Sequence, residues 1–188
     1  MSDAPTNAAL GIDVAAPPGV DVCRALLVYD GAAREVVARL KYRNERAALG
    51  WLADGMAALL RPPVGAVVTW VPTTGPRRRR RGFDQGALLA RAVARRWRVP
   101  AVALLHRRGG GAQTGRTRAE RSRGVALEPR WSPAGGLGDG PVPVVVVDDV
   151  LTTGTTLRCA AMALRSAGAT WVGGLVAART PPDRAGSG

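Results

Sequence analysis

The stretch 142–149, VPVVVVDD, constrains the fold of this chain more than any other. Its four consecutive valines show no alternation of apolar and polar side chains, which is typical of a strand buried on both faces. Other strands are predicted at 23–31, 65–72, 101–105, 125–131 and 170–178. Stretches with helical spacing separate most of these strands. This order predicts an α/β fold, in which a parallel sheet carries helices on both of its faces.

Three stretches carry the signals of helices. The stretch 32–60 has apolar residues at helical spacing and is expected to form two helices, broken near Arg43–Asn44. The stretch 83–99 is predicted to be a helix with Asp84 as its N-cap, and a further helix is predicted over 155–169. On the helix over 83–99, a stripe of apolar residues is expected opposite three arginines, which are Arg91, Arg95 and Arg98.

The composition suits one cytoplasmic domain without membrane insertion. A hydrophobic content of 46% in 188 residues is enough for a real core. No apolar run is long enough to cross a membrane, and the beginning of the chain lacks the pattern of a signal peptide. Two cysteines, Cys23 and Cys159, are too few for a disulfide framework or a four-thiolate zinc site. We expect a flexible N-terminus over 1–22, one domain over 23–180 and a tail over 181–188.

The net charge of +13 is concentrated in one segment. Fifteen arginines and two acids, Asp84 and Glu120, lie between Pro72 and Gly124, so the remainder of the chain is neutral overall. This clustering predicts an anion-binding surface rather than a uniformly basic protein. For the arginines of the helix over 83–99, a plain solvated face is the alternative to a track for nucleic acid.

Two acids and a threonine-rich loop follow the valine run directly. Asp148 and Asp149 are expected at the carboxyl end of a parallel strand, where ligands of such sheets bind. Two adjacent carboxylates can each accept a hydrogen bond from one hydroxyl of a vicinal diol such as that of ribose. The loop LTTGTT at 151–156 offers amides, hydroxyls and a glycine at the start of a helix, which suits a phosphate. The segment therefore predicts a site for ribose 5-phosphate.

Other phosphate-binding motifs are excluded by their own requirements. A Walker loop needs a lysine after its glycine, and the only lysine of the chain is Lys41. The dinucleotide fingerprint needs three spaced glycines directly after its strand, whereas two acids stand there. A phosphoaspartate hydrolase requires acids two positions apart, but Val150 follows Asp148 at that spacing. A receiver domain requires a distant lysine, which is also lacking.

The stretch 144–156, VVVVDDVLTTGTT, resembles the phosphoribosyl-pyrophosphate signature of the type I phosphoribosyltransferases. The stretches 40–53, 77–94 and 116–127 resemble the ComF family (ComFC/GntX-like), which is linked to competence, DNA uptake and the use of external DNA. The resemblance extends over about residues 23–180. ComF proteins commonly begin with a four-cysteine zinc module. Only Cys23 stands in that region here, so the chain resembles a short form without zinc.

The resemblance implies a type I phosphoribosyltransferase-like fold with a mobile flap over the carboxyl-terminal edge of the sheet. It places Asp148 and Asp149 at the catalytic centre and the flap at 107–122, with Arg116, Arg118 and Arg121 turned to the polyphosphate. Mg²⁺ is the implied cofactor, held mainly by the ligand, and no protein ligand of the metal is assigned. The implied substrate-binding residues are Val150, Leu151, Thr152, Thr153, Gly154, Thr155 and Thr156, together with Pro72, Thr73, Thr74, Gly75 and Arg77 of a pyrophosphate loop. Any of the arginines at 78–81 is an alternative to Arg77.

Two functions from different classes stay open at this point. The first is a glycosyltransferase of the phosphoribosyltransferase type, which moves ribose 5-phosphate from phosphoribosyl pyrophosphate to an unidentified acceptor. The second is a ComF-like DNA-uptake factor that binds phosphoribosyl pyrophosphate as a ligand. Its arginine-rich surface would contact single-stranded DNA or a helicase partner. The sequence identifies neither the acceptor nor the oligomeric state.

Overall fold

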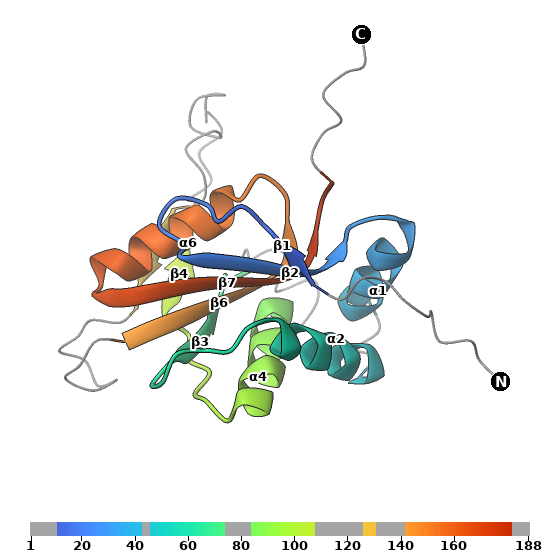
Figure 1. Cartoon of the computed structure of the whole chain (residues 1–188), viewed down its shortest axis with the longest axis horizontal. Helices are drawn as coiled ribbons and strands as arrows, with labels where there is room; N and C mark the ends of the chain where they lie inside the picture. Colours follow the sequence, from blue (N-terminus) through green and yellow to red (C-terminus); the bar gives the residue numbers. More distant parts are fainter. Residues whose placement is uncertain (1–10, 43–45, 74–83, 108–125, 131–141, 182–188) are drawn as a thin grey trace, which may run out of the picture.

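The computed structural model of the chain describes residues 11–42, 46–73, 84–107, 126–130 and 142–181. A sheet of five strands forms the centre of the molecule (Figure 1). The outermost pair is antiparallel, and every other pair of neighbours is parallel. In their order across the sheet, the strands are β1 (Ile12–Asp13), β2 (Val22–Val28), β7 (Ala169–Arg179), β6 (Val142–Leu151) and β3 (Val67–Trp70).

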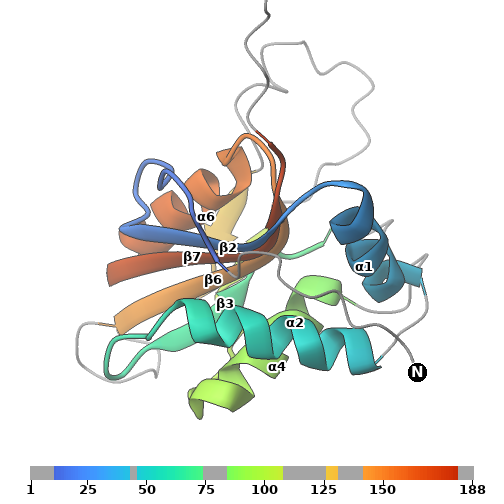
Figure 2. The same cartoon turned by 45° about the vertical axis from the view of Figure 1, so that its right-hand side comes forward.

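Helices cover both faces of this sheet, which confirms the predicted α/β class (Figure 2). One face carries α6, and the other carries α2 and α4, with α1 beside them. Within the described ranges, no helix combines the length and the hydrophobicity needed to cross a bilayer. The helices in the described part of the chain are α1 (Gly31–Tyr42), α2 (Arg46–Leu59), α4 (Gln85–Trp97) and α6 (Thr155–Ser166).

The valine run of β6 supplies both hydrophobic cores. Val144 and Val146 belong to the core under α6, whereas Val145 and Val147 belong to the core under α2 and α4. Successive side chains of a strand point to opposite faces, so a strand between two helical layers must be apolar at every position. This requirement explains why the sequence shows four valines without polar alternation.

The prediction of two helices over 32–60 and the predicted N-cap of α4 are confirmed, while the predicted break near Arg43–Asn44 lies outside the described residues. The helix α1 ends at Tyr42 and α2 begins at Arg46. The carboxylate of Asp84 accepts a hydrogen bond from the amide of Ala87, three residues further on, as an N-cap does. The expectation that Arg98 shares a helix face with Arg91 and Arg95 is wrong. Arg98 is the C-cap residue in the left-handed conformation (φ 56°), outside the helix.

The strand predicted over 101–105 is formed only in part. Ala101 makes an isolated parallel bridge to Val68, and the chain then leaves the central sheet. The amide of Leu104 bonds to the carbonyl of Val102 at 3.0 Å and to the hydroxyl of Thr69 at 3.2 Å, so the backbone turns at this point. A separate antiparallel pair follows, made of β4 (Leu105–Arg107) and β5 (Leu127–Pro129).

Two further differences from the prediction concern the length of β6 and the presence of β1. The strand β6 was expected to end at Asp149 but continues to Leu151. The short strand β1 was not predicted, because two residues carry no periodicity that a sequence pattern can show.

Candidate functional site

The acid pair lies at the carboxyl-terminal edge of the sheet, as predicted. The register pairs Trp70, the last residue of β3, with Val147 of β6. The acids Asp148 and Asp149 therefore extend beyond the end of β3, on the side of the sheet where its neighbouring strand has stopped. On the other side, β6 stays paired with β7 as far as Leu151. The two carboxyl groups are thus carried by a regular strand, beyond the last residue of β3.

Each carboxylate of the pair bonds to the next amide along the chain. The amide of Asp149 donates to Oδ1 of Asp148 at 2.9 Å, and the amide of Val150 donates to Oδ1 of Asp149 at 2.8 Å. Burial, and after it the negative charge of Asp149, raises the pKa of Asp148 to about 8. Asp148 is therefore mostly protonated near neutral pH, and the pair can donate as well as accept a hydrogen bond.

Arg107, the last residue of β4, connects the acid pair with the end of β3. Its Nε donates to the carbonyl of Pro72 at 2.5 Å. Its positive charge also acts against the upward shift in the pKa of Asp148. Arg107 is the first residue of the predicted flap, and the sequence predicts no separate role for it. Its sequence signal, a basic residue just before three glycines, did not separate it from the many other arginines of that segment.

A short hairpin stem holds Arg107 in place. It pairs with Leu127 across the two strands, while His106 pairs with Glu128, with 3.0 Å between Nε2 and Oε2. The flap residues Arg116, Arg118 and Arg121 belong to the segment between these strands and lie outside the described residues.

The start of the predicted pyrophosphate loop is bound to Asp84. The carboxylate of Asp84 accepts the amide of Thr73 at 3.0 Å and the hydroxyl of Thr73 at 3.2 Å. The N-cap of α4 thus also holds the chain where it leaves β3, a second role that sequence analysis missed. Pro72 and Thr73 lie at the predicted edge of the sheet, whereas Thr74, Gly75 and Arg77 lie outside the described residues.

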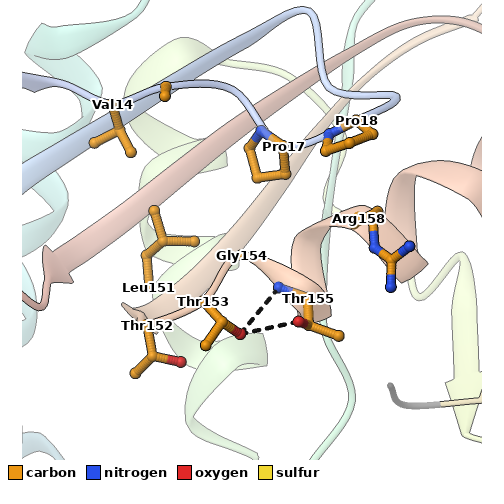
Figure 3. Close-up of a pocket in the computed structure, with 10 residues that line it drawn as sticks. Val14, Pro17, Pro18, Leu151, Thr152, Thr153, Gly154, Thr155 and Arg158 are labelled. Carbon is orange, nitrogen blue, oxygen red and sulfur yellow. Dashed lines mark hydrogen bonds between the residues drawn. The ribbon is translucent and has the colours of Figure 1, made fainter. Parts of the chain in front are cut away.

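The threonine loop joins β6 to α6 through a glycine in the left-handed conformation. Gly154 has φ 72° and is the N-cap residue, with no side chain capping the helix. The amides of a first helical turn have no partner inside the helix, so they can bind an anion. The hydroxyl of Thr153 lies 2.9 Å from that of Thr155 and accepts the amide of Thr155 at 3.4 Å, a weak bond (Figure 3).

A pocket of about 200 Å³ lies at this loop. One part of its lining is the loop itself with Arg158 of α6, and the other part is the segment 14–18 before β2. In the view of Figure 3, Pro17 and Pro18 lie above the loop, while the hydroxyls of Thr152 and Thr153 lie below it. The threonines of the loop predict a phosphate site, but no pattern in the sequence indicates that residues 14–18 line it.

The segment 14–18 is fixed by contacts at both of its ends. Before it, β1 pairs with β2, and the amide of Val14 bonds to the carbonyl of Cys23 at 3.3 Å. After it, Arg165 near the end of α6 donates to the carboxylate of Asp21 at 2.5 Å and to the carbonyl of Gly19 at 3.4 Å. The wall of the pocket is therefore attached to the same helix that begins with the threonine loop.

Replacing Gly154 with alanine is expected to destabilise the protein more than the same change at Gly65. A Cβ atom at Gly154 would lie 2.9 Å from Cγ of Pro17, and φ there is 72°. Gly65 has nearly the same φ, 76°, but has no atom within 4 Å of such a Cβ. Both variants carry the left-handed cost of about 1–2 kcal/mol, and only Gly154→Ala adds the clash. Urea denaturation measures the free energy of unfolding of both variants. Equal losses of stability would show that the contact with Pro17 does not add to the cost.

Comparisons with known proteins give structural likenesses only. No protein-family model matches the chain, and no curated protein is significantly similar to it in sequence. One solved structure is described as the allosteric regulatory enzyme of purine biosynthesis, and it is 24% identical to this chain with a TM-score of 0.45. The match covers 75% of this chain and 25% of that protein. A second solved structure is glutamine phosphoribosylpyrophosphate amidotransferase from B. subtilis, complexed with ADP and GMP, which is 26% identical with a TM-score of 0.46. The match covers 67% of this chain and 25% of that protein.

A third likeness has a more similar length. Adenine phosphoribosyl transferase from Trypanosoma brucei, in complex with AMP, pyrophosphate and ribose-5-phosphate, is 16% identical with a TM-score of 0.45. The match covers 88% of this chain and 74% of that protein. The chain spans only about a quarter of the length of the first two structures.

Proposed function

We propose that the protein binds phosphoribosyl pyrophosphate and transfers its ribose 5-phosphate to an acceptor. The observation that carries this proposal is the continuous unit of β6, the threonine loop and the start of α6. It places two carboxylates, which suit a diol, directly before a loop of amides and hydroxyls, which suits a phosphate. A sugar that carries both groups matches this order along the chain.

The acid pair is suited to the sugar part of such a ligand. Each carboxyl group of Asp148 and Asp149 has one oxygen bonded to the next amide of the chain, which fixes its direction. A ribose hydroxyl can donate to carboxyl oxygens that are held in this way. The reaction breaks the bond between the anomeric carbon and the pyrophosphate oxygen, and that oxygen keeps the electron pair. The acceptor supplies the electron pair of the new bond to the same carbon and releases a proton. Positive charge then develops on the sugar, and a neighbouring carboxylate stabilises it.

The end of β3 and Arg107 are suited to the leaving group. Pro72 and Thr73 begin the loop beside the acid pair, and the guanidinium of Arg107 is fixed on the carbonyl of Pro72. A positive charge at this position offsets the negative charge that the departing pyrophosphate acquires. The arginines of the following loop, beginning with Arg77, are proposed to add to this effect.

The side chains present fit Mg²⁺ held mainly through the ligand. Among the described residues, no group of three or more His, Cys, Asp or Glu side chains is placed to hold a metal ion. Asp148 and Asp149 nevertheless offer carboxylate oxygens, and Mg²⁺ in phosphate sites uses few protein ligands and keeps several waters. When bound, the ion would neutralise part of the charge of the diphosphate.

Phosphoribosyl pyrophosphate with Mg²⁺ is expected to stabilise the protein against heat. A ligand that binds only the folded state adds about 2.7 kcal/mol at a hundredfold excess over its Kd, which is roughly 5–10 °C in Tm for a chain of this size. Thermal melts with ligand and Mg²⁺, with ligand and a chelator, and with Mg²⁺ alone test this. An unchanged Tm at roughly millimolar ligand with Mg²⁺ would contradict the proposal.

Pyrophosphate release separates the transferase from a protein that only binds the ligand. Release on adding phosphoribosyl pyrophosphate, Mg²⁺ and a panel of bases identifies both the activity and the acceptor. The DNA-uptake alternative stays a prediction, because much of the arginine segment lies outside the described residues.

Two arginines of α4, which belong to that segment, have partners within the protein. Arg91 lies 5.5 Å over the ring of Trp70, and Arg96 forms an ion pair with Asp54.

A further inference from the structure

We propose that Arg158 binds the phosphomonoester of the ligand and makes the pocket selective for a doubly charged phosphate. This inference rests on the proposed function, because it names a further residue of the same site. It concerns a residue to which neither the sequence pattern nor the resemblance gave a role.

Arg158 stands in the right place for this contact. It belongs to the first turn of α6, and its side chain lines the pocket together with the threonines of the loop. In the view of Figure 3, its guanidinium lies to the right of Thr155. A phosphate bound to the loop would therefore meet amides, hydroxyls and a guanidinium together.

The guanidinium of Arg158 makes no hydrogen bond or ion pair with the part of the chain that the structure describes. Arg165, two turns further along the same helix, shows the contrast. It bonds to the carboxylate of Asp21 and to three carbonyls, those of Gly19, Ala169 and Thr170. One arginine of α6 thus has a structural role that its partners explain, while the other has a charge directed at the pocket and no internal partner.

The position of Arg158 is also unfavourable without an anion. The amino-terminal end of a helix carries partial positive charge, so a cation in the first turn is repelled there. No acid stands in the first turn of α6 to offset it. An anion at the loop would interact favourably with both the helix and the arginine. A guanidinium can also bind two oxygens of a phosphate at once, which favours a dianion over a neutral or singly charged group.

The test compares Arg158→Gln with the parent protein and with Arg61→Gln. Arg61 is exposed in the segment before β3, toward the opposite end of the sheet, so its variant removes the same charge away from the pocket. Calorimetric titration with phosphoribosyl pyrophosphate and Mg²⁺ is expected to show about tenfold to a hundredfold weaker binding for Arg158→Gln, the usual range for a charged hydrogen bond. Arg61→Gln should bind like the parent.

Inorganic pyrophosphate, as a second ligand, makes the test specific. It is expected to bind at the leaving-group end, so its Kd should be the same for the parent and for Arg158→Gln. Arg158→Lys keeps the positive charge but cannot bind two phosphate oxygens at once, so its Kd for phosphoribosyl pyrophosphate should lie between those of the parent and Arg158→Gln. If Arg158→Gln does not fold, as judged by its circular dichroism, the test rests on Arg158→Lys, whose expected loss is at least severalfold for phosphoribosyl pyrophosphate and absent for pyrophosphate.

Each result decides one of two questions. If the parent binds phosphoribosyl pyrophosphate and Arg158→Gln binds it equally well, the role of Arg158 is refuted while the proposed function stands. Equal weakening of pyrophosphate and phosphoribosyl pyrophosphate would also refute it, because Arg158 would then act only through the overall charge. If the parent binds neither ligand, the proposed function itself fails.

Discussion

Replacing Asp148 and Asp149 together with asparagine is expected to abolish the binding of phosphoribosyl pyrophosphate without unfolding the protein. Asparagine has nearly the same shape, and its carbonyl oxygen can still accept the amides that bond to the two carboxylates at 2.9 and 2.8 Å. What the variant loses is the charge. Above about pH 8, Asp148 is ionised beside the negative charge of Asp149, so the titration is made there. Each charged hydrogen bond to a ribose hydroxyl then contributes about 1.5–3 kcal/mol, and two of them correspond to a loss of at least roughly a hundredfold in affinity.

Calorimetric titration in the presence of Mg²⁺ measures this loss, and circular dichroism confirms the fold. Asp54→Asn is the matched control, since Asp54 is an exposed acid of α2 that pairs with Arg96 on the helical layer. It should bind the ligand like the parent. Parental affinity in the double variant would place the ribose elsewhere on the protein.

The second large effect is a dependence of stability on pH that comes from Asp148. Its pKa is about 8 in the folded protein and about 3.9 in an unfolded chain. Between these values the folded state holds a proton that the unfolded state has released. The free energy of unfolding therefore falls as pH rises from about 4, and this decline ends once pH has passed about 8. Asp148 thus lowers stability increasingly toward neutral and alkaline pH.

Asp148→Asn removes the titrating group and is expected to flatten this decline. Urea denaturation at pH 5, 6, 7 and 8 measures the free energy of unfolding of both proteins. The difference in favour of Asp148→Asn should grow by a few kcal/mol from pH 5 to pH 8, with roughly 1.4 kcal/mol per pH unit as an upper bound. Asp149→Asn should reduce the slope in part, because the charge of Asp149 contributes to the shift in the pKa of Asp148. Parallel profiles for the parent and Asp148→Asn would show that Asp148 ionises normally.

The elements that sequence analysis predicted well are those with a local physical cause. The valine run identified a strand buried on both faces, and the structure divides those valines between two cores. Asp84 was predicted as an N-cap because the cap depends on residues close in sequence. The end of the strand over 101–105 was predicted wrongly. The hydroxyl of Thr69, far away in the sequence, takes the amide of Leu104 as the chain turns out of the sheet.

The candidate site shows the same division. The acids and the threonine loop form one continuous stretch, so their proximity could be predicted from the sequence alone. The contact of Pro17 with the loop depends on the left-handed conformation of Gly154 and on the fixing of a distant segment by Arg165, and neither is visible in a pattern. Arg107 could not be selected from fifteen clustered arginines until its hydrogen bond to Pro72 was known.

The double contact between Thr73 and Asp84 has a consequence for how such a site can change during evolution. Residues 74–83 join two points of the chain that one carboxylate already ties together. Inserting or deleting residues between them therefore need not alter the distance between β3 and α4, and the entropic cost of a longer loop rises only slowly with its length. The loop proposed to hold the leaving group can therefore change in length, while β3 and α4 keep their spacing.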